Sequence, residues 1–149
     1  MISWNKIMTL SSDKESVKTP KVVRSKEEWE SLLAPEVYRV TRLHGTERPF
    51  SGEYCHIFEP GKYACICCDK LLFDSSDKFD SGTGWPSFSK PVDDSSVVYK
   101  KDTSFGMIRI EISCENCAAH LGHVFPDGPP PSYLRYCLNS LSLKKITHE

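Results

Sequence analysis

Two Cys-x-x-Cys pairs, Cys65/Cys68 and Cys114/Cys117, constrain the fold of this chain more than any other feature of its sequence. Each pair places two sulfurs on one turn, and four thiolates complete the tetrahedral shell that Zn²⁺ prefers in closed structural sites. We therefore expect one structural Zn²⁺ that ties a hairpin near residues 63–70 to a turn near residues 113–118. Such a closed site has no open position for chemistry. Cys67, which lies inside the first pair, is expected to point away from the ion.

The size and charge of the chain fit one small domain. Its 149 residues suffice for a single core. The opening segment has no sustained apolar periodicity, so we expect residues 1–24 to be a flexible N-terminal arm and residues 25–149 to form the domain. With 19 basic and 20 acidic residues, the net charge of -1 provides no basic field for nucleic acid or an anionic membrane. We expect a monomer with no nucleic acid and no membrane among its partners.

The cysteine pattern also predicts a reducing compartment. Seven cysteines in a secreted chain would suggest disulfides with one thiol left over, but two matched pairs favour metal binding instead. No run approaches the roughly 18 apolar residues that a membrane span needs, and the first segment lacks the apolar core of a signal peptide. Asp13, Glu15 and the absence of arginine there argue against a transit peptide. A cytoplasmic location is expected.

Short helices should precede a mainly β domain. Ser25 and Glu28 form a capping box for a short helix that Pro35 interrupts, and a second helical turn is expected from Pro35 to about Thr41. Residues 45–61 are rich in turn formers and should form a surface loop. The β-type runs that follow are separated by Gly, Pro, Asp and Ser clusters. They cover residues 63–66, 71–73, 97–99, 106–112, 121–125 and 134–143.

With four sulfurs assigned to the metal, Cys137 is the candidate nucleophile. It lies downstream of His120 and His123, and on a strand its side chain would share one face with those of Arg135 and Asn139. A free cysteine has a pKa of about 8.5, so Arg135 or a histidinium should help to form the thiolate. We expect this thiol to be partly exposed in electropositive surroundings.

Three segments together resemble the methionine sulfoxide reductase B family: FDSGTGWPSF at residues 79–88, CAAHLGHVF at 117–125 and RYCLNS at 135–140. The similarity covers about residues 42–143 in order and spacing, including both cysteine pairs and GTERPF at 45–50. It implies a compact fold of two antiparallel sheets stapled by zinc. It also implies a protein-repair enzyme that reduces the R epimer of methionine sulfoxide in oxidised proteins, with thioredoxin as the electron source.

Each requirement of this chemistry has a candidate residue. Cys137 would attack the electrophilic sulfur and become a sulfenic acid. His120 or His123 would protonate the sulfoxide oxygen or bind it through water, and the spacing leaves open which of the two is nearer. By similarity both belong to the active site, and Asn139 would orient a polar group there. Two aromatic side chains would form walls around the S-methyl group, namely Trp85 and Phe125.

One position departs from the family pattern. Many members carry a resolving cysteine between the two glycines before the tryptophan, where it condenses with the sulfenic acid to form a disulfide, and this position is Thr83 here. Cys55 and Cys67 are substitutes, of which Cys55 is preferred because Cys67 is confined between zinc ligands. Direct reduction by an external thiol is the competing route. The alternative function is a non-catalytic zinc-stapled module for protein interaction, which would have no use for Cys137.

Overall fold

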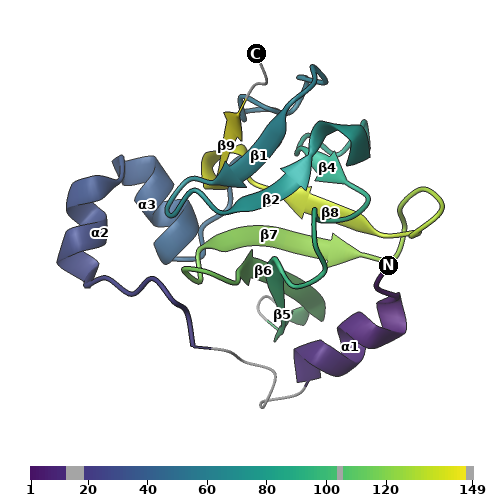
Figure 1. The fold of residues 1–149 in the computed structure, drawn as a ribbon, viewed down its shortest axis with the longest axis horizontal. Helices are drawn as coiled ribbons and strands as arrows, with labels where there is room; N and C mark the ends of the chain where they lie inside the picture. Colours follow the sequence, from purple (N-terminus) through teal and green to yellow (C-terminus); the bar gives the residue numbers. More distant parts are fainter. Residues whose placement is uncertain (13–18, 104–105, 147–149) are drawn as a thin grey trace.

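The strands of the computed structural model form two antiparallel sheets (Figure 1), and residues 1–12, 19–103 and 106–146 are described. This confirms the mainly β fold class. The smaller sheet has the order β2-β1-β9, from β1 (Lys62–Cys65), β2 (Leu71–Asp74) and β9 (Leu143–Ile146). The larger sheet has the order β3-β4-β8-β7-β6-β5, from β3 (Lys78–Phe79), β4 (Ser87–Phe88), β5 (Val97–Asp102), β6 (Arg109–Cys114), β7 (His120–Phe125) and β8 (Arg135–Leu138).

Aromatic side chains from both sheets form the centre of the core. Tyr63 and Phe73 come from the smaller sheet, Phe88 and Tyr136 come from the larger one, and all four are fully buried. The rings of Phe73 and Phe88 stack with centroids 4.6 Å apart. Because side chains alternate along a strand, Tyr136 in the core leaves its neighbour Cys137 on the opposite face of β8. The outer face of the larger sheet is therefore available for a site.

The N-terminal segment differs from the prediction of a flexible arm. Helix α1 (Trp4–Ser12) packs against β5, and its Ile7 is fully buried in the core. Trp4 lies one turn before Ile7, Met8 follows Ile7 directly, and both are partly buried against the same cluster. The arm prediction is thus wrong for residues 4–12, where three apolar side chains at helical spacing cover a sheet edge. Residues 13–18 of the predicted arm lie outside the described residues.

Helices α2 (Lys26–Leu32) and α3 (Pro35–Arg42) confirm the predicted helical pair. The backbone N–H of Glu28 donates to Ser25 Oγ at 3.2 Å, and that of Ser25 donates to Glu28 Oε1 at 3.1 Å, which completes the capping box. The guanidinium of Arg42 lies 4.3 Å from the ring centroid of buried Trp29, and this cation–π contact joins α3 to α2. No helix in the described part of the chain is long and apolar enough to cross a membrane.

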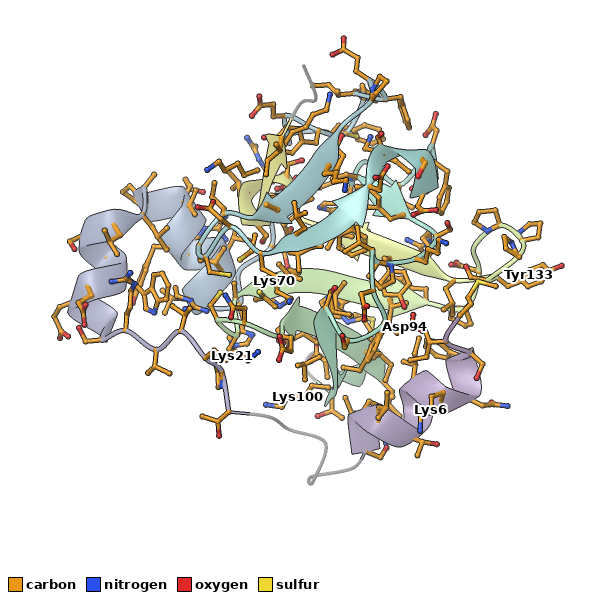
Figure 2. The ribbon with its side chains drawn as sticks, in the orientation of Figure 1. Lys6, Lys21, Lys70, Asp94, Lys100 and Tyr133 are labelled. Atoms are coloured by element: carbon orange, nitrogen blue, oxygen red, sulfur yellow. The ribbon has the colours of Figure 1, made fainter. Side chains whose placement is uncertain are left out.

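The predicted run at residues 134–143 is two strands rather than one. A 3-10 turn, η4 (Ser140–Ser142), separates β8 from β9 and transfers the chain from the larger sheet to the smaller one. The connection between β7 and β8 carries the consecutive prolines and the exposed Tyr133 (Figure 2). Side chains alternate along β6, where Ile110 and Ile112 are buried while Arg109 and Glu111 face the other side.

Candidate active site and metal centre

The four cysteines of the two Cys-x-x-Cys pairs lie together. The Sγ atoms of Cys65 and Cys117 are 3.6 Å apart, and so are those of Cys68 and Cys114. All four sulfurs lie within 4.8 Å of one another. With Zn–S bonds of about 2.3 Å, the sulfurs of a tetrahedral site are separated by roughly 3.8 Å. The four side chains therefore fit a closed tetrahedral metal site.

This cysteine cluster joins the two sheets. Cys65 ends β1 in the smaller sheet, and Cys114 ends β6 in the larger one. A bound ion would hold the β1–β2 hairpin against the β6–β7 turn. Cys67 is not one of the four candidate ligands. It lies between the two ligands of the first pair in sequence and is half-buried.

A pocket of about 240 Å³ opens on the outer face of the larger sheet. The sheet supplies Cys137, and the loop before β4 supplies Thr83. The walls include both aromatic residues that the sequence analysis selected. Five residues predicted from the sequence line this pocket together with Cys137, namely Trp85, His123, Phe125, Arg135 and Asn139.

His123, rather than His120, stands beside Cys137. His123 and Cys137 are register partners across β7 and β8, so their side chains leave the same face of the sheet. His120 would face the other way in a regular strand, but a register shift between β6 and β7 turns it to the same face. The two imidazole rings meet edge to face with centroids 5.6 Å apart. His120 is 2% exposed and does not line the pocket.

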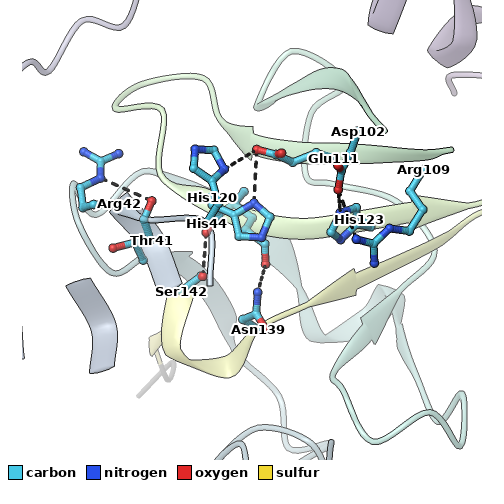
Figure 3. Close-up of polar contacts among 11 residues, drawn as sticks. Thr41, Arg42, His44, Asp102, Arg109, Glu111, His120, His123, Asn139 and Ser142 are labelled. Carbon is cyan, nitrogen blue, oxygen red and sulfur yellow. Dashed lines mark hydrogen bonds and ion pairs between the residues drawn. The ribbon is translucent and has the colours of Figure 1, made fainter. Parts of the chain in front are cut away.

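Asp102, at the end of β5, orients His123 (Figure 3). The Nε2 atom of His123 lies 2.9 Å from Asp102 Oδ2, and Arg109 Nη2 lies 3.3 Å from the same oxygen. Burial lowers the pKa of His123 although the contact with Asp102 opposes this shift, so the ring is mostly neutral at pH 7. Arg109 also lines the pocket, and its buried Nε has no hydrogen-bond partner among the described residues. Arg109 thus offers a donor to a polar group in the pocket.

Asn139 and Glu47 hold the backbone around the pocket. The side-chain amide of Asn139 donates to the carbonyl of Leu121 at 3.3 Å, and its Oδ1 accepts the backbone N–H of Glu47 at 3.1 Å. The carbonyl of Glu47 in turn accepts the indole N–H of Trp85 at 3.0 Å. Asn139 therefore fixes the irregular part of β7 and the loop that supports Trp85. Glu47 was not selected from the sequence.

The turn that carries Trp85 requires glycine. Gly84 has φ +91°, and a Cβ at this position would lie 2.7 Å from Cβ of Pro49. The close approach lets the N–H of Phe50 donate to the Gly84 carbonyl at 2.7 Å. The GTERPF segment consequently packs directly on the tryptophan turn, and the indole is held as a wall of the pocket.

Arg135 lines the pocket and contacts Asp127 and Phe125. Its guanidinium forms a bidentate pair with Asp127, at 2.8 and 3.2 Å, and lies 4.3 Å from the ring centroid of Phe125. Burial raises the pKa of the Cys137 thiol, while the charge of Arg135 and a hydrogen bond with Thr83 oppose the shift. The charge of Arg135 therefore favours the thiolate, as expected, although burial outweighs it in the site without substrate.

This balance sets the reactivity of Cys137 toward alkylation. We expect the rate of carbamidomethylation by iodoacetamide, followed at the Cys137 peptide by mass spectrometry, to be still rising above about pH 9. Arg135→Met should slow the reaction at neutral pH, since the thiolate loses its cation, while the exposed control Arg48→Met should not. A plateau below pH 8 in the unmodified protein would contradict this.

The candidate resolving cysteines lie apart from Cys137. Neither Cys55 nor Cys67 lines the pocket. Cys55 is half-buried in the loop at residues 45–61, and burial raises its thiol pKa. The usual resolving position, Thr83, does adjoin Cys137, and its hydroxyl is also paired with Ser81 Oγ at 2.8 Å.

Comparison with known proteins shows the class of protein, because the model of the SelR domain matches residues 33–147 of this chain. The chain is 59% identical to the peptide methionine sulfoxide reductase MsrB of Pseudomonas putida (strain W619), over 83% of this chain and 92% of the relative. It is 60% identical to the protein of the same name from Pseudomonas fluorescens (strain Pf-5), over 85% and 97%. The chain therefore belongs to the methionine sulfoxide reductase B family, as the motifs predicted.

Proposed function

We propose that this protein reduces the R epimer of methionine sulfoxide in oxidised proteins and peptides to methionine. The observation that supports this most strongly is the pocket that gathers Cys137, His123 and Arg109 between the rings of Trp85 and Phe125. The Cys137 thiol, the His123 ring as proton carrier and the Arg109 guanidinium as hydrogen-bond donor thus line a space large enough for a thioether side chain. The names of the similar proteins support the same activity.

The proposed reaction transfers one oxygen atom from the substrate to the enzyme. The Cys137 sulfur attacks the sulfoxide sulfur and forms an S–S bond, while the thiol proton passes through the neutral His123 ring to the sulfoxide oxygen. The hydroxyl then moves to the Cys137 sulfur as the substrate S–O bond and the S–S bond break. Methionine leaves with its sulfur reduced by two electrons, and Cys137 remains as a sulfenic acid, oxidised by two electrons. Asp102 holds the His123 ring for this transfer, and Arg109 Nε supplies a hydrogen bond to the oxygen.

The ion in the cysteine cluster is proposed to be one structural Zn²⁺ per chain, which would take no part in these steps. The protein is proposed to act as a monomer that binds exposed methionine sulfoxide on a partner protein. Four cysteines gathered as metal ligands fit a reducing location such as the cytoplasm.

Recycling needs a second thiol. A thiol that condenses with the sulfenic acid releases water and forms a disulfide, which thioredoxin then reduces. We propose Cys55 as this thiol, since the loop that carries it adjoins the tryptophan turn. Cys55→Ser should then lower turnover with thioredoxin while leaving the first reduction step intact. Unchanged thioredoxin-dependent turnover in this variant would exclude Cys55 and favour direct attack by the external thiol.

The activity is tested with purified protein, dithiothreitol and each epimer of peptide methionine sulfoxide. Dithiothreitol bypasses the recycling step, so the assay reports the first reaction. We expect methionine to form from the R epimer alone. If folded, metal-loaded protein reduced neither epimer, the enzyme interpretation would be abandoned for the non-catalytic interaction module.

A further inference from the structure

A second group of metal-binding side chains lies apart from the cysteine cluster. The Nδ1 atom of His44 is 3.0 Å and that of His120 is 3.3 Å from the same oxygen, Glu111 Oε1 (Figure 3). The three candidate ligand atoms lie within 4.8 Å of one another. The rings of His44 and His120 approach to 5.3 Å between centroids. The three side chains therefore converge on one point.

Three separate features of the fold produce this convergence. Glu111 leaves the outer face of β6, opposite His123 in the β6–β7 register. The register shift in β7 turns His120 to that face, and Ser142 Oγ holds the His120 carbonyl at 2.8 Å. His44 follows α3 with φ 57°, a left-handed conformation that non-glycine residues adopt rarely and that turns the chain at this point.

His120 gives an independent indication of a ligand. Its side chain is only 3% exposed, and its buried Nδ1 has the 3.3 Å contact with Glu111 but no hydrogen bond assigned among the described residues. A buried ring nitrogen of this kind is costly unless a partner completes it. The carboxylate is charged: burial would raise the pKa of Glu111, but contacts with His120 and His44 together lower it to about 2.

We propose that His44, Glu111 and His120 form a second metal site, which takes a divalent transition-metal ion such as Zn²⁺. Two ligands with bonds of about 2.0–2.2 Å and angles between octahedral and tetrahedral values lie roughly 2.9–3.5 Å apart. The two nitrogen–oxygen distances fall in this range. Imidazole and carboxylate donors suit Zn²⁺, and a soft thiolate is not required. The side chain of His44 is 59% exposed, so water can complete the shell and the ion can enter from solvent.

Binding here would act on the catalytic pocket through His120, and this consequence rests on the proposed function. The ion would fix the His120 ring, which packs edge to face on His123. Reduction of the R epimer should therefore slow when the second site fills. Metal stoichiometry is measured separately from activity, so an inactive enzyme and an absent site give different results.

The experiment uses the full chain that already carries one zinc equivalent, titrated with Zn²⁺ by calorimetry and checked by elemental analysis after gel filtration. We expect one further equivalent to bind. Loss of a ligand in His44→Ala or Glu111→Gln should weaken this second equivalent at least tenfold, since even outer-shell changes cost about 10–100-fold in metal affinity. His56→Ala, which removes another exposed imidazole, is the matched control and should bind as the parent does.

Thermal melting without added metal establishes that each variant is folded, and His44 tolerates replacement because it is exposed. The proposal is overturned if the parent protein binds no second equivalent. It is also overturned if the second equivalent binds equally well to folded His44→Ala, because the ion would then lie elsewhere and the three side chains would form only a charged hydrogen-bonded cluster.

Discussion

Cys137→Ser is expected to lower the rate of methionine-R-sulfoxide reduction by ~10³-fold or more. A serine hydroxyl stays protonated in the same buried position, so the attacking sulfur and the acceptor of the oxygen are both lost. The fold should be unaffected, because Cys137 faces the pocket and replacement by serine leaves the packing of Tyr136 in the core unchanged. The measurement is methionine formation with dithiothreitol under substrate saturation.

The matched control for this variant is Cys67→Ser, which also removes one thiol outside the four candidate metal ligands. It should retain the rate of the parent protein in the same assay. A Cys137→Ser protein with even a tenth of the parental rate would show that another group takes the oxygen.

Loss of the metal from the cysteine cluster is expected to unfold the domain. The ion would join the two sheets across Cys65 and Cys114, and structural zinc contributes about 10–16 kcal/mol in zinc-finger peptides, as much as the roughly 5–15 kcal/mol stability of a typical domain. Cys114→Ser should therefore lose both the zinc equivalent and the cooperative thermal transition. Elemental analysis and circular dichroism of the same sample measure the two quantities together.

Cys67→Ser serves as the comparison again, because Cys67 lies between the candidate ligands Cys65 and Cys68 but is not itself one. It should keep one zinc equivalent and a cooperative transition. Native-like melting of a zinc-free Cys114→Ser protein would mean that the two sheets hold together through their aromatic core alone.

Much of the fold could be predicted because it depends on local patterns. The capping box at Ser25 and the cysteine spacing each act over a few residues, and the structure confirms both. The predictions fail where tertiary contacts, rather than local sequence, determine which element forms. Helix α1 is too short to be stable alone and forms because Ile7 covers the sheet. Strands β3 and β4 have two residues each, too few to show a period.

The candidate site shows the same division. Cys137, Trp85 and the two histidines stand in recognisable motifs, but which histidine adjoins the thiol depends on the register shift in β7. Asp102 and Arg109 belong to no motif, and they meet His123 only because β5, β6 and β7 are neighbours. For Arg109, its outward position on a strand whose other face is buried was the signal that could have identified it. The raised pKa of Cys137 required its burial to be known.

The central claim is that Cys137 takes the oxygen of the sulfoxide, and a single turnover without any reductant tests it most directly. Mixing the protein with excess R-sulfoxide peptide should yield one methionine per chain, with Cys137 oxidised either to a sulfenic acid trapped by dimedone or to a disulfide, as mass spectrometry would identify. No methionine, or one methionine formed while Cys137 stays a free thiol, would contradict the account.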